Sequence, residues 1–265
     1  MTEINQEDLD ILNAVMEEQH KEIPENSKSI IISDTTSRFS GAIWYDKVKQ
    51  TNVTLAGVGG IGSWCALLLA KLNVNKLTMY DYDSVESTNI AGQFYGVSQI
   101  GSFKTSAVAE SLRNYARYND YVCRPERFVA TSPTSNVMIC GFDNMAARKT
   151  FFEAWLNRVG NYTDKSKLLF IDGRLNAEEF QIFAIQGDDT NAIEKYRREY
   201  LFDDSEVEEA ICSYKQTSFM ANMIASYMIN IFVNFIANQC DPIIPRDVPF
   251  FTSYTADTMF TKMIM

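Results

Sequence analysis

Four closely spaced glycines after a short apolar run are the first feature of this sequence that could do chemistry. Gly57, Gly59, Gly60 and Gly62 stand between an apolar segment at 52–58 and a helix-like segment at 63–72. Glycines permit a tight turn and close backbone approach, and a helix N-terminus offers free N–H groups to a phosphate. Asp81 ends the next apolar segment, where an acid can bind ribose hydroxyls. The order predicts a nucleotide site, although such glycines can also serve only to pack a helix against a strand.

The segments that would position this site alternate between strand-like and helix-like patterns. Such alternation indicates a parallel sheet with right-handed crossovers, and ligands bind at the carboxyl ends of its strands. We expect an α/β fold with a Rossmann-like, doubly wound, mostly parallel sheet and terminal antiparallel strands within 247–265. The expected strands are 52–58, 76–81, 121–128, 137–141, 168–172 and 179–185, and the expected helices are 63–72, 103–118 and 144–158.

The rest of the chain is divided by charge and hydropathy. Residues 1–35 are expected to form an N-terminal helical extension, and residues 36–265 a single domain. A charged crossover segment at about 187–215 reads as a connector and precedes a long apolar helix from Gln216. Polar residues recur every fourth position along that helix, which favours a half-buried amphipathic helix over a membrane span because polar stripes are costly in lipid. The polar residues that recur along this helix are Asn222, Ser226, Asn230, Asn234 and Asn238.

Composition excludes several classes of protein. The chain has 265 residues and a formal net charge of −10, which argues against a general nucleic-acid or anionic-membrane binder. The five cysteines form no C-x-x-C pair, so we expect no structural zinc, and their scatter fits a reducing compartment. The acidic N-terminal stretch is unlike a signal peptide, and a cytoplasmic location is expected. The single histidine, His20, makes catalysis by a histidine base improbable.

A run of ordered polar residues narrows the choice of nucleotide. Asp81, Asp83, Asn89 and Gln93 are followed by Lys104, and later by Cys140-Gly-Phe-Asp143-Asn144 with Arg148. Over about residues 36–240 the chain resembles the ThiF/MoeB family, which includes ubiquitin-activating enzymes and bacterial sulfur-carrier adenylyltransferases.

The resemblance implies an enzyme that binds ATP and Mg²⁺ and adenylates the C-terminal glycine of a ubiquitin-like or sulfur-carrier protein ending in Gly-Gly. It implies dimers as well, either homodimers or heterodimers. Asp143 would hold Mg²⁺, Lys104 would pair with phosphate, and Asp81 would hold the ribose. Besides Asp81, the nucleotide-binding residues implied by the resemblance are Gly57, Gly59, Gly60, Gly62, Asp83, Asn89, Gln93, Lys104 and Asn144.

Cys212 is the candidate nucleophile for a later acyl transfer, because it follows the acidic connector and precedes the long helix as in the family. A buried, unreactive thiol is the alternative at this position. Cys65 and Cys140 are expected in the core. Arg148 is open to either a structural or a functional role, the former as a partner of Asp143.

Two departures from the family leave other functions open. Gly41 and Gly92 stand where the family has phosphate-facing arginines, and Arg38, Lys47, Lys49 or Arg113 are the candidate substitutes. One alternative is a nucleotide-binding but adenylation-deficient partner subunit or scaffold. A second is an adenylyltransferase for another carboxylate, such as a peptide C-terminus. A nicotinamide-dependent oxidoreductase is the third, and no catalytic signature supports it.

Overall fold

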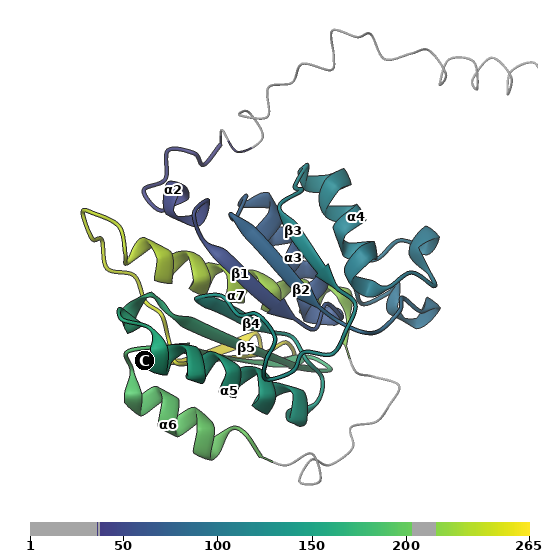
Figure 1. Ribbon diagram of the computed structural model, residues 1–265. Helices are drawn as coiled ribbons and strands as arrows, with labels where there is room; N and C mark the ends of the chain where they lie inside the picture. The colour runs from purple at the N-terminus through teal and green to yellow at the C-terminus, as the bar shows by residue number, and fades with distance from the viewer. Residues whose placement is uncertain (1–35, 37, 203–215) are drawn as a thin grey trace, which may run out of the picture. The chain divides into compact units, whose positions relative to one another are not determined.

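An eight-stranded sheet in the order β3-β2-β1-β4-β5-β6-β7-β8 organises the fold (Figure 1). The computed structural model describes residues 36, 38–202 and 216–265. Five strands run parallel, and β6, β7 and β8 are antiparallel, which confirms the predicted doubly wound sheet with antiparallel terminal strands. The strands are β1 Asn52–Ala56, β2 Lys76–Tyr80, β3 Tyr121–Arg124, β4 Val137–Cys140, β5 Leu169–Asn176, β6 Glu179–Gln186, β7 Phe251–Thr255 and β8 Phe260–Ile264.

Helices cover both faces of this sheet, as its doubly wound topology requires. One face packs against α3 (Gly60–Lys71), α4 (Lys104–Ala116) and α7 (Ser218–Ala237). The other face packs against α5 (Met145–Asn161) and α6 (Thr190–Glu199). The remaining short elements are α2 Tyr45–Val48, η3 Ser87–Asn89, η4 Val97–Gln99 and η5 Lys165–Lys167.

The central strands are mostly apolar because both of their faces are covered. Along β4, Val137 and Ile139 enter the core under α3 and α7, whereas Met138 and Cys140 enter the core under α5. Strands β1, β2 and β4 run parallel, so the loops that follow them lie at one edge of the sheet.

The segment at 187–210 differs from the expected connector, because it contains a helix. Asp189 caps α6 by accepting a hydrogen bond from Ala192 N at 2.9 Å. Ala192, Ile193 and Tyr196 are buried, while the charged side chains of Glu194, Arg197, Arg198 and Glu199 on the same helix are exposed. Only one side of the helix is apolar, so its composition concealed it. The expected N-terminal helical extension at 1–35 and Cys212 lie outside the described residues.

The long apolar helix α7 is half-buried, as its polar stripe predicted. Within the described residues it is the one helix long and apolar enough to span a membrane by length and composition, and 56% of its most apolar window is buried inside the fold. Ser226 and Asn230 are exposed. Asn234 and Asn238 donate to the carbonyls of Asp247 and Arg246 at 2.9 and 2.8 Å, which anchors the segment leading to β7. Burial against the sheet and α3 accounts for the apolar face of the helix.

Candidate functional site

The glycine loop after β1 makes a turn that side chains would block. Gly57 has φ of +79°, a conformation that residues with a side chain rarely adopt. A Cβ at Gly62 would lie 1.8 Å from the carbonyl oxygen of Gly57, so only glycine lets α3 begin this close to the strand. At Gly59 the nearest atom to such a Cβ is on Gln93, 3.8 Å away, so this side of the loop is open enough for a ligand to approach the backbone.

Asp81 ties the glycine loop to the end of β2. Its Oδ2 accepts from Val58 N and its Oδ1 accepts from Asp83 N, both at 2.9 Å. Burial raises the pKa of this carboxyl, while the two N–H donors and the nearby Lys104 favour the charged form. Each oxygen keeps a lone pair for another donor, so the geometry permits contacts with ribose hydroxyls.

Lys104 begins α4 with its side chain buried and paired to Asp83. Its Nζ lies 2.9 Å from Asp83 Oδ2, and its backbone N donates to Asp83 O at 2.9 Å. A cation is unfavourable at a helix N-terminus, and the Asp83 carboxylate offsets this cost. Because the Asp83 side chain is 47% exposed, solvent and ligands can reach this pair. A phosphate arriving here would compete with Asp83 for the ammonium group.

Asn89 and Gln93 occupy different environments. Asn89 Oδ1 accepts from Glu86 N at 2.9 Å within the turn η3, so it has a local structural role. Gln93 Oε1 is buried and has no hydrogen-bond partner among the described residues. It faces Gly59 at the open side of the loop. An unsatisfied buried polar atom at this point fits a bound nucleotide, because its desolvation is costly without a partner.

The loop after β4 carries the candidate metal ligand. Asp143 is exposed, and Asn144 donates to its Oδ1 at 3.2 Å. Asn144 also caps α5 by accepting from Ala147 N at 2.8 Å. No cluster of three or more metal-ligating side chains occurs among the described residues. One carboxylate with phosphate oxygens is nevertheless the kind of ligand set that Mg²⁺ uses, so Asp143 fits such an ion.

The two loops touch at their glycines. Gly141 N donates to Ala56 O at 2.8 Å, and a Cβ at Gly57 would lie 2.7 Å from the carbonyl carbon of Gly141. The structure therefore brings the glycine loop, the Asp81–Asp83 segment and the Asp143 loop to the same edge of the sheet. Together they can accept hydrogen bonds from ribose hydroxyls, pair a cation with phosphate and offer a carboxylate to a metal.

Gln216 at the start of α7 is a site residue that the sequence pattern did not predict. A Cβ at Gly60 would overlap its side chain, with Oε1 only 1.8 Å away, and a Cβ at Gly92 would lie 3.4 Å from its Cγ. Its amide thus lies between the glycine loop and the position where the family has an arginine. Contact across more than a hundred residues leaves no local signal in the sequence.

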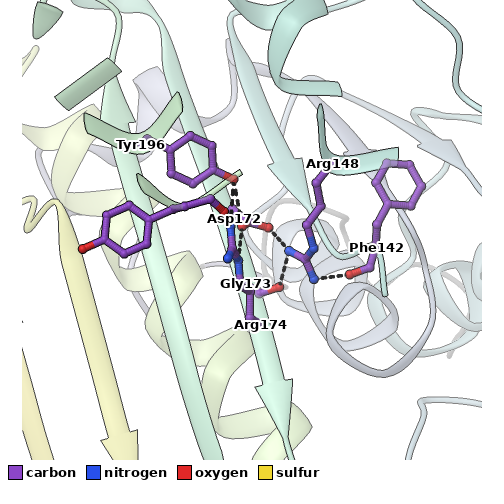
Figure 2. A network of polar contacts seen from close by, with 7 residues as sticks. Phe142, Arg148, Asp172, Gly173, Arg174 and Tyr196 are labelled. Atoms are coloured by element: carbon purple, nitrogen blue, oxygen red, sulfur yellow. Dashed lines mark hydrogen bonds and ion pairs between the residues drawn. The ribbon is translucent and has the colours of Figure 1, made fainter. Parts of the chain in front are cut away.

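A buried charge network behind the Asp143 loop was also missed (Figure 2). Asp172 on β5 is fully buried and contacts both Arg148 from α5 and Arg174 on its own strand. Arg148 was expected to pair with Asp143, if it had a structural role. It pairs with Asp172 instead: the Arg148 side chain is buried beside β5, where Asp172 lies, whereas Asp143 is exposed.

Three candidate substitutes for the missing arginines have other partners. Lys47 donates to Gln239 O, Lys49 pairs with Asp46 at 2.8 Å, and Arg113 donates to the Tyr121 hydroxyl. Arg38 belongs to a separate N-terminal unit, Met1–Phe39, and its role stays a prediction.

The cysteines expected in the core are found there. Cys65 and Cys140 are fully buried, and burial raises the pKa of both thiols, which makes them unreactive at neutral pH. The candidate nucleophile Cys212 lies outside the described residues, so its reactivity stays a prediction.

A comparison with protein families decides the ancestry of this site. The model of the ThiF family matches residues 31–263, which is most of the chain. The chain belongs to the ThiF family. The match covers the glycine loop, the Asp81 segment, Lys104 and the Asp143 loop, so all four lie within the part of the chain that is similar to the family.

Curated relatives of this ThiF protein share a shorter stretch. It is 35% identical over 68 residues to ubiquitin-like modifier-activating enzyme 5 of Arabidopsis thaliana, covering 26% of this chain and 16% of that protein. The protein of the same name from Xenopus laevis is 33% identical over 116 residues, covering 41% of this chain and 29% of that protein. The matched segments therefore span less than a third of the length of these relatives.

Solved structures with the same fold extend over nearly the whole ThiF chain. Escherichia coli MccB crystallised with ATP superposes with a TM-score of 0.63 at 14% identity, covering 98% of this chain and 78% of that one. PaaA superposes with a TM-score of 0.62 at 18% identity, covering 83% and 74%. At these identities the likeness establishes the fold.

Proposed function

We propose that this ThiF protein is an ATP- and Mg²⁺-dependent adenylyltransferase that acts on the C-terminal carboxylate of a ubiquitin-like or sulfur-carrier protein ending in Gly-Gly. The observation that carries the proposal is the convergence of the open glycine loop, Asp81 and the Asp83–Lys104 pair, which solvent reaches through Asp83, at one sheet edge. Family membership and the curated relatives, named as ubiquitin-like modifier-activating enzymes, support the substrate class.

Each residue at the edge has a defined task in this proposal. Asp81 accepts the ribose hydroxyls, and the backbone at Gly59 and Gly60 lies against the phosphates. Lys104 exchanges its contact with Asp83 for one with phosphate oxygen. Gln93 supplies its unsatisfied amide oxygen to a nucleotide donor, and Asn144 holds Asp143 in place. When bound at Asp143, Mg²⁺ would neutralise charge on the phosphates.

The reaction is a balanced in-line displacement. A carboxylate oxygen of the carrier attacks the α-phosphorus of ATP and forms a new P–O bond. The bond from the α-phosphorus to the bridging oxygen breaks, and pyrophosphate leaves with that electron pair. The protein contributes position and charge neutralisation, because no proton transfer is needed in this step.

A second step would transfer the acyl group to Cys212. The thiolate attacks the acyl carbon of the adenylate, a thioester forms, and AMP leaves. We also propose that the protein works as a homodimer or heterodimer, as the family resemblance implies, and that it is cytoplasmic, since its scattered cysteines fit a reducing compartment.

ATP–pyrophosphate exchange with Mg²⁺ tests the proposal. Three probes are compared: a ubiquitin-like protein ending in Gly-Gly, the same protein ending in an amide, and a short peptide with a free carboxylate. We expect exchange with the free Gly-Gly end and none with the amide. Exchange with the peptide alone would indicate that the substrate is another kind of carboxylate. Asp143→Ala should abolish exchange, whereas Cys212→Ser should leave it intact and abolish a thioester.

A nucleotide-binding partner subunit is the second candidate, and one observation favours it. Gln216, a neutral amide, lies against Gly92, where the family has an arginine, and Gly41 removes a second guanidinium. Loss of one such charge-assisted contact typically lowers rate about 10²–10³-fold. ATP binding without exchange with any of the three probes would favour this candidate. Exchange that appears on adding a second ThiF protein would then establish it.

A further inference from the structure

Asp172 holds two arginines on one buried carboxylate (Figure 2). It lies on β5 opposite Cys140 of β4, and it is fully buried. Arg148 Nη1 contacts its Oδ1, and Arg174 Nε donates to its Oδ2 at 2.7 Å. The Tyr196 hydroxyl donates to Oδ2 as well, at 2.9 Å. The group carries a net charge of about +1, counted from one carboxylate and two guanidiniums that are always protonated.

The two arginines connect this carboxylate to different parts of the molecule. Arg148 Nη2 donates to the carbonyl of Phe142, which directly precedes Asp143, and its Nη1 donates to Gly173 O at 3.2 Å. Arg174 Nη2 donates to Tyr200 O at 2.8 Å, at the end of α6, and its guanidinium lies 4.7 Å from the centre of the Phe183 ring. Arg148 therefore contacts the candidate metal loop, whereas Arg174 contacts α6 and its neighbours.

Burial of such a group needs a reason beyond stability. Buried ion pairs are often no more stabilising than well-packed apolar side chains of the same volume, because desolvation offsets the attraction between the charges. A guanidinium can instead hold a backbone carbonyl in a fixed place, since its donors form a rigid planar fork. Asp143 itself is exposed. The loop before it is held at Gly141, whose N donates to Ala56 O at 2.8 Å, and at Phe142, whose carbonyl accepts from Arg148.

We propose that Arg148, held by Asp172, is a positioning residue for the Mg²⁺ bound at Asp143, whereas Arg174 has a structural role only. The inference rests on the proposed function, because it takes Asp143 as the metal ligand. Mg²⁺ demands near-octahedral geometry, and groups that orient its ligands typically change metal affinity about 10–100-fold when they are lost. Arg148 acts through the Phe142 carbonyl and touches neither metal nor nucleotide.

Because both arginines contact Asp172, Arg148→Lys and Arg174→Lys are a matched pair of variants. Lysine keeps the charge and loses the fork, so both variants disturb the same carboxylate. Binding of ATP is measured by calorimetry over a Mg²⁺ titration, together with thermal unfolding. We expect both variants to melt at lower temperature. The Mg²⁺ concentration for half-maximal ATP binding should rise about tenfold or more in Arg148→Lys and less than about twofold in Arg174→Lys.

Controls separate this inference from the proposed function. If the unaltered protein binds no ATP with Mg²⁺, the proposed function itself fails. If it binds ATP but Asp143→Asn requires no more Mg²⁺, the metal assignment fails. If both hold and the two lysine variants shift equally, or neither shifts, the positioning role is overturned. Should Arg148→Lys not fold, Asp172→Glu displaces both arginines with charge conserved, and an unchanged Mg²⁺ requirement there would also overturn the positioning role.

Discussion

The two halves of the candidate site handle charge in opposite ways. At the β1–β2 edge, Lys104 faces a carboxylate that is 47% exposed, so the pair can open to a ligand. Behind the β4–β5 edge, Arg148 and Arg174 share Asp172, whose side chain has no exposure to solvent. Solvent at Asp83 screens the first pair and lets a ligand replace the carboxylate, whereas a fully buried carboxylate cannot be lost without leaving unpaired charges. The first half is therefore suited to exchange partners, and the second half to hold a backbone still.

The largest predicted loss of stability is at the buried carboxylate. Asp172→Asn keeps the shape of the side chain but leaves two guanidiniums without a counter-charge. We expect the free energy of unfolding to fall by about 3–5 kcal/mol, measured by urea denaturation. Asp83→Asn is the matched variant at the exposed pair, and there we expect a loss of about 1 kcal/mol. Equal losses would show that exposure does not separate the two halves.

The largest effect on activity should come from the exposed half. Lys104→Ala removes the cation that faces phosphate in our proposal, and we expect pyrophosphate exchange to fall about 10²–10³-fold. Arg113→Ala on the same helix serves as the control, because Arg113 contacts the Tyr121 hydroxyl at β3. Comparable losses in both variants would indicate a helix-wide effect instead of a phosphate contact.

A smaller effect is expected at the glycine turn that joins the two halves. Gly62→Ala would place Cβ 1.8 Å from the Gly57 carbonyl, which neither backbone segment can accommodate without moving. We expect about 1–3 kcal/mol of destabilisation and weaker ATP binding. Gly160→Ala, with open space around its Cβ near the end of α5, should instead stabilise by roughly 0.5–1 kcal/mol. Thermal unfolding of both variants tests the contrast.

The smallest effect is a pH dependence at Asp81. Burial raises the pKa of this carboxyl in the folded state, so the folded protein binds a proton at a pH where the unfolded chain does not. The unfolding free energy contributed by Asp81 therefore increases as pH falls through the raised pKa. Asp81→Asn should lose about 1 kcal/mol at neutral pH, because the amide accepts from only one of the two N–H groups. The gap between unaltered protein and variant should widen in acid, and a constant gap contradicts this assignment.

Much of the fold was predictable because its signals are local. Strands β1, β2 and β4 were expected within one or two residues of their observed ends, since their apolar runs are bounded by Gly or Asp. Helix α3 begins at Gly60, three residues earlier than expected, because the glycines themselves open the helix. Helix α6 was missed, because only Ala192, Ile193 and Tyr196 mark its buried side among many charges.

The site divides along the same line. The sequence pattern predicted the glycine loop and Asp81, because each directly follows a strand of one parallel sheet, and the family resemblance added Lys104 and the Asp143 loop. Only the tertiary structure decided that Lys104 pairs with Asp83, that Gln216 lies on the glycine loop, and that Arg148 turns inward to Asp172. These contacts join residues far apart in the chain, and burial and packing select them from many partners of suitable charge.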